Sequence, residues 1–161
     1  MKFSDFIHSD AIISDLEATT RDDAIREIVE TLAKACDYSE EWVDVISDAV
    51  LERDKLASTA IGDGIAIPHA SKQQEVDRLV GAVAISRDGV DFCASDGEPV
   101  HTLFLVVSPI ETAGAHLIAL EYVASQLRDT EFVENLRNAA TREDLKAVLD
   151  AADAAHSASA D

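Results

Sequence analysis

The amino-acid sequence predicts an α/β fold, a single-domain sandwich in which a mixed β-sheet is flanked by helices. Amphipathic helical segments lie on both sides of a central group of short apolar runs, and no linker or internal repeat divides the chain. The length of 161 residues suits one domain with a sizeable core, and the hydrophobic content of 47% argues against disorder. We expect the domain to cover residues 1–150 and an Ala/Ser-rich, disordered tail to follow at 151–161.

Two helices are expected in the first third of the chain. Residues 1–19 are mixed and can supply a short strand or a helical turn. Thr20 provides a hydroxyl N-cap for a helix with an acidic first turn and an apolar residue at every third or fourth position. A second helix starts at Ser39 and ends near 52–55, which places Arg53 in its last turn.

Strands are expected in the middle of the chain, where short apolar runs end at glycine, proline or polar residues. These runs are 65–67, 79–85, 90–92 and 100–107, with a turn at 87–89. Helical periodicity returns after the last run. The expected helices cover about 113–128 and 129–138, and a final one begins near 141.

The sequence carries no recognisable membrane or export segment. No apolar run approaches the roughly 20 residues that a membrane-spanning helix needs. The first residues lack the charged-then-apolar pattern of a secretory signal. We therefore expect a cytoplasmic protein without direct membrane insertion.

The negative charge is the unusual feature of the composition. Asp and Glu number 32 against 13 Lys and Arg, which gives a formal net charge of -19. Nucleic acid and anionic membranes are therefore poor candidate partners. Such self-repulsion is tolerable where salt screens it, because the Debye length is about 3 Å at 1 M. We interpret the charge as the mark of a halophile with a salt-filled cytoplasm; an ordinary acidic mesophile protein is the alternative.

The stretch from Ser58 to Ala70 presents a histidine in a defined place. Gly62 and Gly64 permit backbone angles or close approaches that a Cβ would forbid. Pro68 favours an extended backbone before it and is expected to end the strand. His69 then follows on a backbone whose conformation is restricted. An imidazole that titrates near neutral pH and is held in this way suits a functional site.

His116 occupies a comparable position in a second segment. It lies in the first turn of the helix that is expected after the strand terminated by Pro109. If the strands before His69 and His116 run in the same direction, both rings lie at one end of the sheet, where α/β folds place their sites. Arg53 precedes the glycine-containing stretch closely and can supply a guanidinium to the same place.

Three chemistries fit two histidines and an arginine. In phosphohistidine transfer a neutral imidazole attacks a phosphoryl group, and Arg53, the Thr59 hydroxyl and backbone N–H groups hold the charge. A metal site would need a third ligand such as His101 or Asp96, although no HxH or HExxH spacing supports it. An acid–base hydrolase would need a nucleophile elbow or paired carboxylates, which the sequence does not offer. Two structural histidines without a catalytic role are the remaining alternative.

Several motifs resemble one known family, and they occur in that family's order. They are Glu52-Arg53, the run from Ser58 to His69, the run from Asp96 to Val100, and His116-Leu117. Together they resemble the signature of the fructose/mannitol-type (type-2) enzyme IIA domain of the sugar phosphotransferase system (PTS), a family that includes a nitrogen-regulatory branch. The resemblance covers about residues 1–150, and its most specific part is the Gly-Ile-Ala-Ile-Pro-His run at 64–69.

The resemblance implies a role for each candidate residue. His69 would accept phosphate from the phosphocarrier protein HPr and pass it to a cysteine of a sugar-specific IIB domain. His116 would be the second active-site histidine, and Arg53 would stabilise the phosphoryl group. Thr59, together with Ser58, would bind the phosphate through a hydroxyl group. The exchange needs neither a metal nor a cofactor.

The resemblance also implies a function and its alternative. The expected function is that of a cytoplasmic phosphocarrier in sugar uptake, with fructose as the expected sugar and a membrane IIC component as the part that selects it. The alternative is a nitrogen-type regulatory IIA protein, in which phosphorylation of His69 controls binding to target proteins. Both would use the same site.

Overall fold

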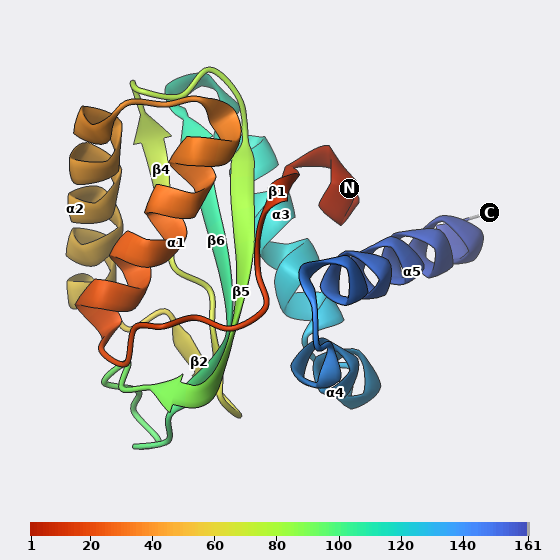
Figure 1. Cartoon of the computed structure of the whole chain (residues 1–161). Helices are drawn as coiled ribbons and strands as arrows, with labels where there is room; N and C mark the ends of the chain where they lie inside the picture. The colour runs from red at the N-terminus through yellow and green to blue at the C-terminus, as the bar shows by residue number, and fades with distance from the viewer. Residues whose placement is uncertain (161) are drawn as a thin grey trace.

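A mixed six-stranded sheet forms the centre of the computed structural model, which describes residues 1–160 (Figure 1). The strands are β1 Ile7–Ile13, β2 Ala60–Gly62, β3 Ile65–Ala66, β4 His69–Gln73, β5 Val80–Val90 and β6 Val100–Pro109. The order is β1-β5-β6-β3-β2, and β4 also pairs with β6. β5 and β6 are antiparallel, whereas β1 runs parallel to β5, and β3 and β4 run parallel to β6. The predicted α/β sandwich with a mixed sheet is confirmed.

Helices cover both faces of this sheet. They are α1 Arg21–Cys36, α2 Glu40–Leu56, α3 Ala113–Gln126, α4 Thr130–Asn138 and α5 Arg142–Ala160, with short 3-10 helices at Phe3–Asp5 (η1) and Ile110–Thr112 (η2). Figure 1 shows α1 and α2 on one side and α3, α4 and α5 on the other. Each side encloses its own apolar cluster against the sheet. None of the described helices is both long and apolar enough to cross a membrane.

The first two helices begin where the sequence predicts. The Thr20 hydroxyl accepts a hydrogen bond from the Asp23 N–H, and the Ser39 hydroxyl accepts one from the Trp42 N–H. These bonds satisfy backbone donors that have no partner inside the helix. α2 continues to Leu56, so Arg53 lies in its last turn as predicted.

The segment at 87–89 differs from its prediction, because β5 passes through it. The pairing of β5 with β6 shifts register between Ile85 and Val90, and Gly89 adopts a φ of 90°. The Gly89 N–H donates to the Ser86 hydroxyl at 2.9 Å. Glycine and a local side-chain acceptor thus produce a bulge within one strand where the sequence suggested a turn between two.

The end of the chain also differs from its prediction, because α5 continues through residues 151–160 in place of a disordered tail. Alanine is the best helix former, so an alanine-rich end can extend a helix that has already begun. Asp153 anchors it: this buried carboxylate accepts hydrogen bonds from the Phe3 and Ser4 N–H groups at 2.7 and 2.9 Å and from the Tyr122 hydroxyl at 3.1 Å. Asp161 lies outside the described residues.

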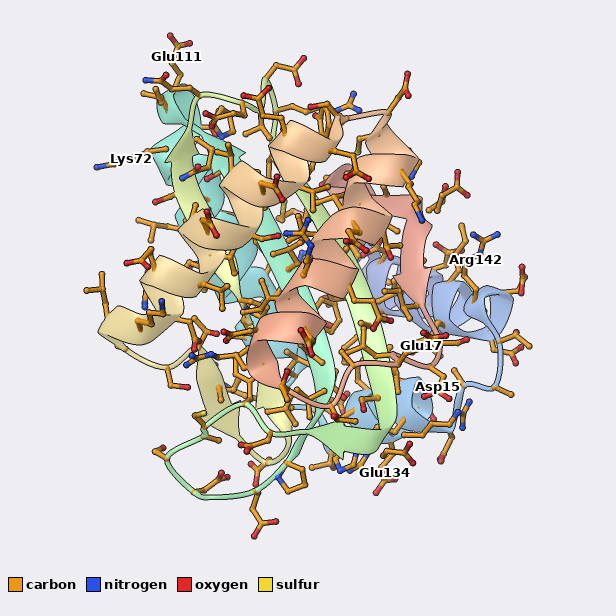
Figure 2. The ribbon with its side chains drawn as sticks, turned by 60° about the vertical axis from the view of Figure 1, so that its left-hand side comes forward. Asp15, Glu17, Lys72, Glu111, Glu134 and Arg142 are labelled. Atoms are coloured by element: carbon orange, nitrogen blue, oxygen red, sulfur yellow. The ribbon has the colours of Figure 1, made fainter. Side chains whose placement is uncertain are left out.

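Carboxylates cover the surface without gathering in one patch. Figure 2 shows exposed Glu111 at one end of the molecule and exposed Asp15, Glu17 and Glu134 towards the other. Because 32 acidic residues face only 13 basic ones, most of them must repel one another.

We expect the chain to melt at a higher temperature in molar KCl than at low salt, because salt screens this repulsion. Each kcal/mol of added stability should raise the midpoint by about 2–4 °C for a chain of this size. Circular dichroism melting over a KCl series measures it. Equal midpoints at low and molar salt would refute the halophilic interpretation.

Candidate functional site

The central strand β6 serves as the template that places His69. β3 pairs with β6 through Ile65 and Thr102, the chain passes Pro68, and β4 pairs with β6 again through His69 and Val106. Pro68 therefore interrupts the pairing without ending it, because its carbonyl oxygen still accepts from the Val106 N–H at 3.1 Å. His69 opens a new strand, β4, beside the central strand β6, where the sequence predicted a strand end.

The glycines that precede the site fulfil their predicted role. Gly62 and Gly64 have φ values of 92° and 75°, in the region that favours glycine. They form the turn between the antiparallel strands β2 and β3. This hairpin returns the chain to β6 just before His69.

The His69 ring is half-buried and held in one tautomer. Its Nδ1 lies 2.8 Å from the carbonyl oxygen of Ile67. A carbonyl can only accept, so Nδ1 carries the hydrogen and Nε2 keeps its lone pair. Burial lowers the pKa of His69 below 6.5, and the Arg53 charge lowers it further, partly opposed by the Ile67 bond and by Asp54. At neutral pH the ring is a neutral nucleophile whose reactive nitrogen is Nε2.

His116 lies beside His69. The sequence predicted this for strands that run in the same direction, and β4 and β6 are parallel. The two ring centroids are 5.5 Å apart, with the ring planes inclined at 56°. The Nδ1 of His116 lies 2.7 Å from the Oγ of Ser108 at the end of β6. Burial, and secondarily the neighbouring His69, lowers the pKa of His116 from 6.5 to about 4.

The two rings line a surface pocket of about 410 Å³ together with Arg53. The complete lining is Ala49, Arg53, His69, Ala70, Ser71, Gln73, His116, Leu117 and Leu120. Arg53 donates from Nη1 to the Ala57 carbonyl at 2.9 Å, which uses one of the five N–H groups of its guanidinium. Leu117 is 67% exposed and gives the rim an apolar side chain, as protein interaction surfaces do.

The predicted phosphate-binding hydroxyls of Thr59 and Ser58 are not brought to this pocket. The N–H and the hydroxyl of buried Thr59 both donate to the Oδ1 of Asp54, at 2.8 and 2.6 Å. The Ser58 hydroxyl accepts from the Ala60 N–H at 3.2 Å. The hydroxyl hydrogen of Thr59 is therefore already used within the fold.

His101 and Asp96, the third ligands considered for a metal, lie away from the histidine pair. The Nδ1 of His101 lies 2.8 Å from the Ser86 carbonyl, and its ring lines a different pocket. Within the described residues, no group of three or more His, Cys, Asp or Glu side chains is placed to hold a metal ion. The arrangement in the pocket favours an anion as its ligand.

Two supporting residues escaped the sequence analysis. Asp54 is 3% exposed and accepts from Thr59 and, through Oδ2, from the Arg21 guanidinium at 3.3 Å. The sequence did contain an indication of this role: Asp54 lies four residues after Val50 and so falls on the buried, apolar face of α2. Ser108 offered a weaker signal, a hydroxyl inside an otherwise apolar strand.

The lowered pKa of His116 makes the stability of the fold depend on pH. The unfolded ring takes up a proton near pH 6.5, whereas the folded ring resists protonation down to about pH 4. Its contribution is complete above pH 6.5 and is lost as the pH falls towards 4. We expect a loss of about 2 kcal/mol, once solvent screening of an open pocket is allowed for.

Urea unfolding of the wild type and His116→Gln between pH 4 and 7 isolates this effect, because the other titrating groups are common to both proteins. The difference in unfolding free energy between the two should shrink as the pH falls. A difference that stays constant over this range would contradict the expectation.

Known proteins of similar sequence and fold include nitrogen regulatory and fructose-specific PTS proteins. A relative from Bradyrhizobium diazoefficiens, named nitrogen regulatory protein, is 33% identical over 150 residues, which are 92% of this chain and 95% of the relative. A relative from Haloferax volcanii, named PTS system fructose-specific EIIA component, is 36% identical over 106 residues, or 66% of this chain and 68% of the relative. The crystal structure of nitrogen regulatory protein IIA-Ntr from Neisseria meningitidis superposes with a TM-score of 0.80 at 28% identity and covers 91% of this chain and 98% of that one.

The family described as "Phosphoenolpyruvate-dependent sugar phosphotransferase system, EIIA 2" matches residues 5–152. This range includes the histidine pair, Arg53 and both faces of the sheet. The chain therefore belongs to the EIIA 2 family of the phosphoenolpyruvate-dependent sugar phosphotransferase system.

Proposed function

We propose that this chain is a phosphocarrier that takes a phosphoryl group onto His69 from an HPr-type donor and passes it on. The observation that supports this most directly is the hydrogen bond from His69 Nδ1 to the Ile67 carbonyl, at 2.8 Å. It leaves Nε2 as a lone-pair nitrogen on a half-buried, neutral ring. The family to which the chain belongs carries phosphate between PTS components.

The chemical step requires no cofactor. The Nε2 lone pair of His69 forms a bond to phosphorus while the bond from phosphorus to the donor's nitrogen breaks, and that electron pair returns to the donor ring. The His69 ring becomes positively charged and keeps its Nδ1 hydrogen, which strengthens the bond to the Ile67 carbonyl. The ring charge and Arg53 then offset the two negative charges of the phosphoryl group.

The acceptor decides between two forms of this function. A cysteine of a IIB domain would make the chain part of sugar uptake, and the similarity to a relative named for fructose-specific EIIA supports fructose as the sugar. A regulatory target would make it a nitrogen-type protein, which the full-length similarity to a relative named nitrogen regulatory protein supports. The first form is the proposal, and the second is the candidate that it must exclude.

One experiment tests the carrier function and then separates the two forms. The chain is incubated with radiolabelled phospho-HPr, and acid-labile label is followed on gels. Label should appear on the chain and leave when a fructose-type IIB domain is added. Label that stays on the chain with IIB present would favour the regulatory form, and no label at all would refute the carrier function.

Replacing Arg53 with alanine should slow phosphate transfer roughly 30-fold or more, a loss of about 2 kcal/mol or more, because removing one preorganised group that stabilises charge typically costs about 3 kcal/mol. Arg53 lines the pocket with His69 and its guanidinium suits bidentate contact with phosphate oxygens. Single-turnover transfer from phospho-HPr measures the rate. Arg137→Ala, on the exposed surface of α4, is the matched control and should transfer at the wild-type rate. Equal transfer rates for the two variants would show that Arg53 does not stabilise the phosphoryl group.

A further inference from the structure

The contact between Ser108 and His116 joins the end of β6 to the first turn of α3. The Ser108 Oγ lies 2.7 Å from the His116 Nδ1, and both residues are buried. Ser108 is fully shielded from solvent, with 0% exposure. A buried hydroxyl at this distance must either donate its hydrogen to the ring or accept one from it.

The direction of this hydrogen bond follows from the requirement that the buried hydroxyl hydrogen has an acceptor. Among the described residues, His116 Nδ1 is the only hydrogen-bond partner of the Ser108 Oγ. If the ring donated, the serine hydrogen would be left in the interior without an acceptor, which is costly. The hydroxyl therefore donates to Nδ1, and Nδ1 carries no hydrogen.

The charge state of His116 completes the assignment. Burial lowers the pKa of His116 to about 4, so the ring is neutral at physiological pH and carries a single N–H. Since Nδ1 accepts from Ser108, this hydrogen is on Nε2, the nitrogen that is not turned to the buried serine. The ring lines the same pocket as His69.

We propose that Ser108 is a positioning residue that fixes His116 as its Nε2–H tautomer, so that this ring donates a hydrogen bond to a phosphoryl group on His69. The proposal rests on the phosphocarrier function. The two rings, 5.5 Å apart, then hold opposite tautomers, because His69 carries its hydrogen on Nδ1 and offers a lone pair at Nε2. One ring attacks phosphorus and the other stabilises the transferred group.

A neutral donor also suits a carrier that must release its cargo. A hydrogen bond from a neutral N–H is weaker than one from a charged group, so it orients the phosphoryl oxygens without holding them as firmly as an imidazolium would. Arg53 already supplies a full positive charge in the pocket. Ser108 contributes by ensuring that the second ring presents a hydrogen, since a neutral ring with free choice of tautomer would often present a lone pair that repels the phosphate.

Nitrogen-15 NMR of the histidine side chains tests the tautomer directly, in unphosphorylated protein without a partner. His116 in the wild type should show its hydrogen on Nε2, Ser108→Ala should show a mixture of tautomers, and Ser108→Thr should restore the wild-type pattern. His69 should keep its Nδ1 hydrogen throughout. Ser47→Ala removes another buried serine hydroxyl, on α2, and should alter neither ring.

Three results would overturn the assignment: a hydrogen on Nδ1 of His116 in the wild type, an unchanged tautomer in Ser108→Ala, or the same disturbance in Ser47→Ala. The wild-type spectrum and Ser108→Thr decide the question even if Ser108→Ala does not fold.

Transfer kinetics test the consequence for phosphate. Ser108→Ala should accept phosphate from phospho-HPr about tenfold more slowly, the size expected for losing one oriented hydrogen bond, and Ser108→Thr should recover the rate. Wild-type rates in Ser108→Ala, combined with a disturbed tautomer, would overturn the role of the bond in transfer. Failure of the wild type to accept any phosphate would instead refute the phosphocarrier function, and the NMR result would stand apart from it.

Discussion

Replacing His69 with alanine should abolish phosphate incorporation from phospho-HPr. His69 has the one imidazole in the pocket whose Nδ1 hydrogen is committed to a backbone carbonyl and whose Nε2 lone pair is available, whereas the neighbouring His116 ring is paired with Ser108. No other lining residue offers a nucleophile of this kind, because Ser71 has no adjacent base among the described contacts. We expect incorporation to fall to the background level of the assay, measured by acid-labile radiolabel and by intact mass.

The matched control for His69→Ala is His116→Ala, which removes the other ring of the pair. This variant should still take up phosphate, more slowly, because the nucleophile is intact. Phosphorus-31 NMR of the labelled wild type should in addition place the phosphate on Nε2 of the ring. Label that persists on His69→Ala, or phosphate found on Nδ1 in the wild type, would contradict the site geometry.

Local signals in the sequence were enough to predict the helices and the histidine pair. The caps at Thr20 and Ser39 depend on residues three positions apart, so they can be read along the chain. His69 and His116 were predicted to meet because each follows a proline at an apolar run, and the parallel pairing of β3 and β4 with β6 fulfils that condition. The resemblance to the enzyme IIA family then named the chemistry that the pair alone left open.

Features set by the hydrogen bonds of single buried carboxylates could not be predicted in this way. The sequence assigned the Thr59 hydroxyl to a phosphate, but the buried Asp54 carboxylate five residues earlier takes it. It assigned disorder to the last residues, but the bonds from Phe3 and Ser4 to Asp153 cross the length of the chain. Composition and periodicity report which surfaces are apolar, and they do not show where a single buried carboxylate finds its donors.

Asp54→Ala should lower the free energy of unfolding by about 3–5 kcal/mol, the range for breaking a buried ion pair by removing one partner. The loss leaves both Thr59 donors without their acceptor and removes the buried one of the two carboxylates that pair with the Arg21 guanidinium, Asp22 being the other. Asp44→Ala is a close control, because Asp44 also joins α2 to an arginine of α1, Arg26, at 2.7 Å, but is 62% exposed. That exposed pair should contribute less than about 1 kcal/mol. Urea unfolding measures both, and equal losses would refute the assigned role of Asp54.

The Asp54→Ala substitution should also slow phosphate transfer, because Asp54 begins a chain of hydrogen bonds that ends at His69. Asp54 holds Thr59, the Thr59 carbonyl accepts from the Ile67 N–H at 3.0 Å, and the Ile67 carbonyl accepts from the His69 ring at 2.8 Å. Loosening the first bond frees the carbonyl that fixes the tautomer of the nucleophile. Phosphate transfer by folded Asp54→Ala should therefore slow while Asp44→Ala retains the wild-type rate. A buried carboxylate that never touches the phosphate would then govern how readily His69 carries it.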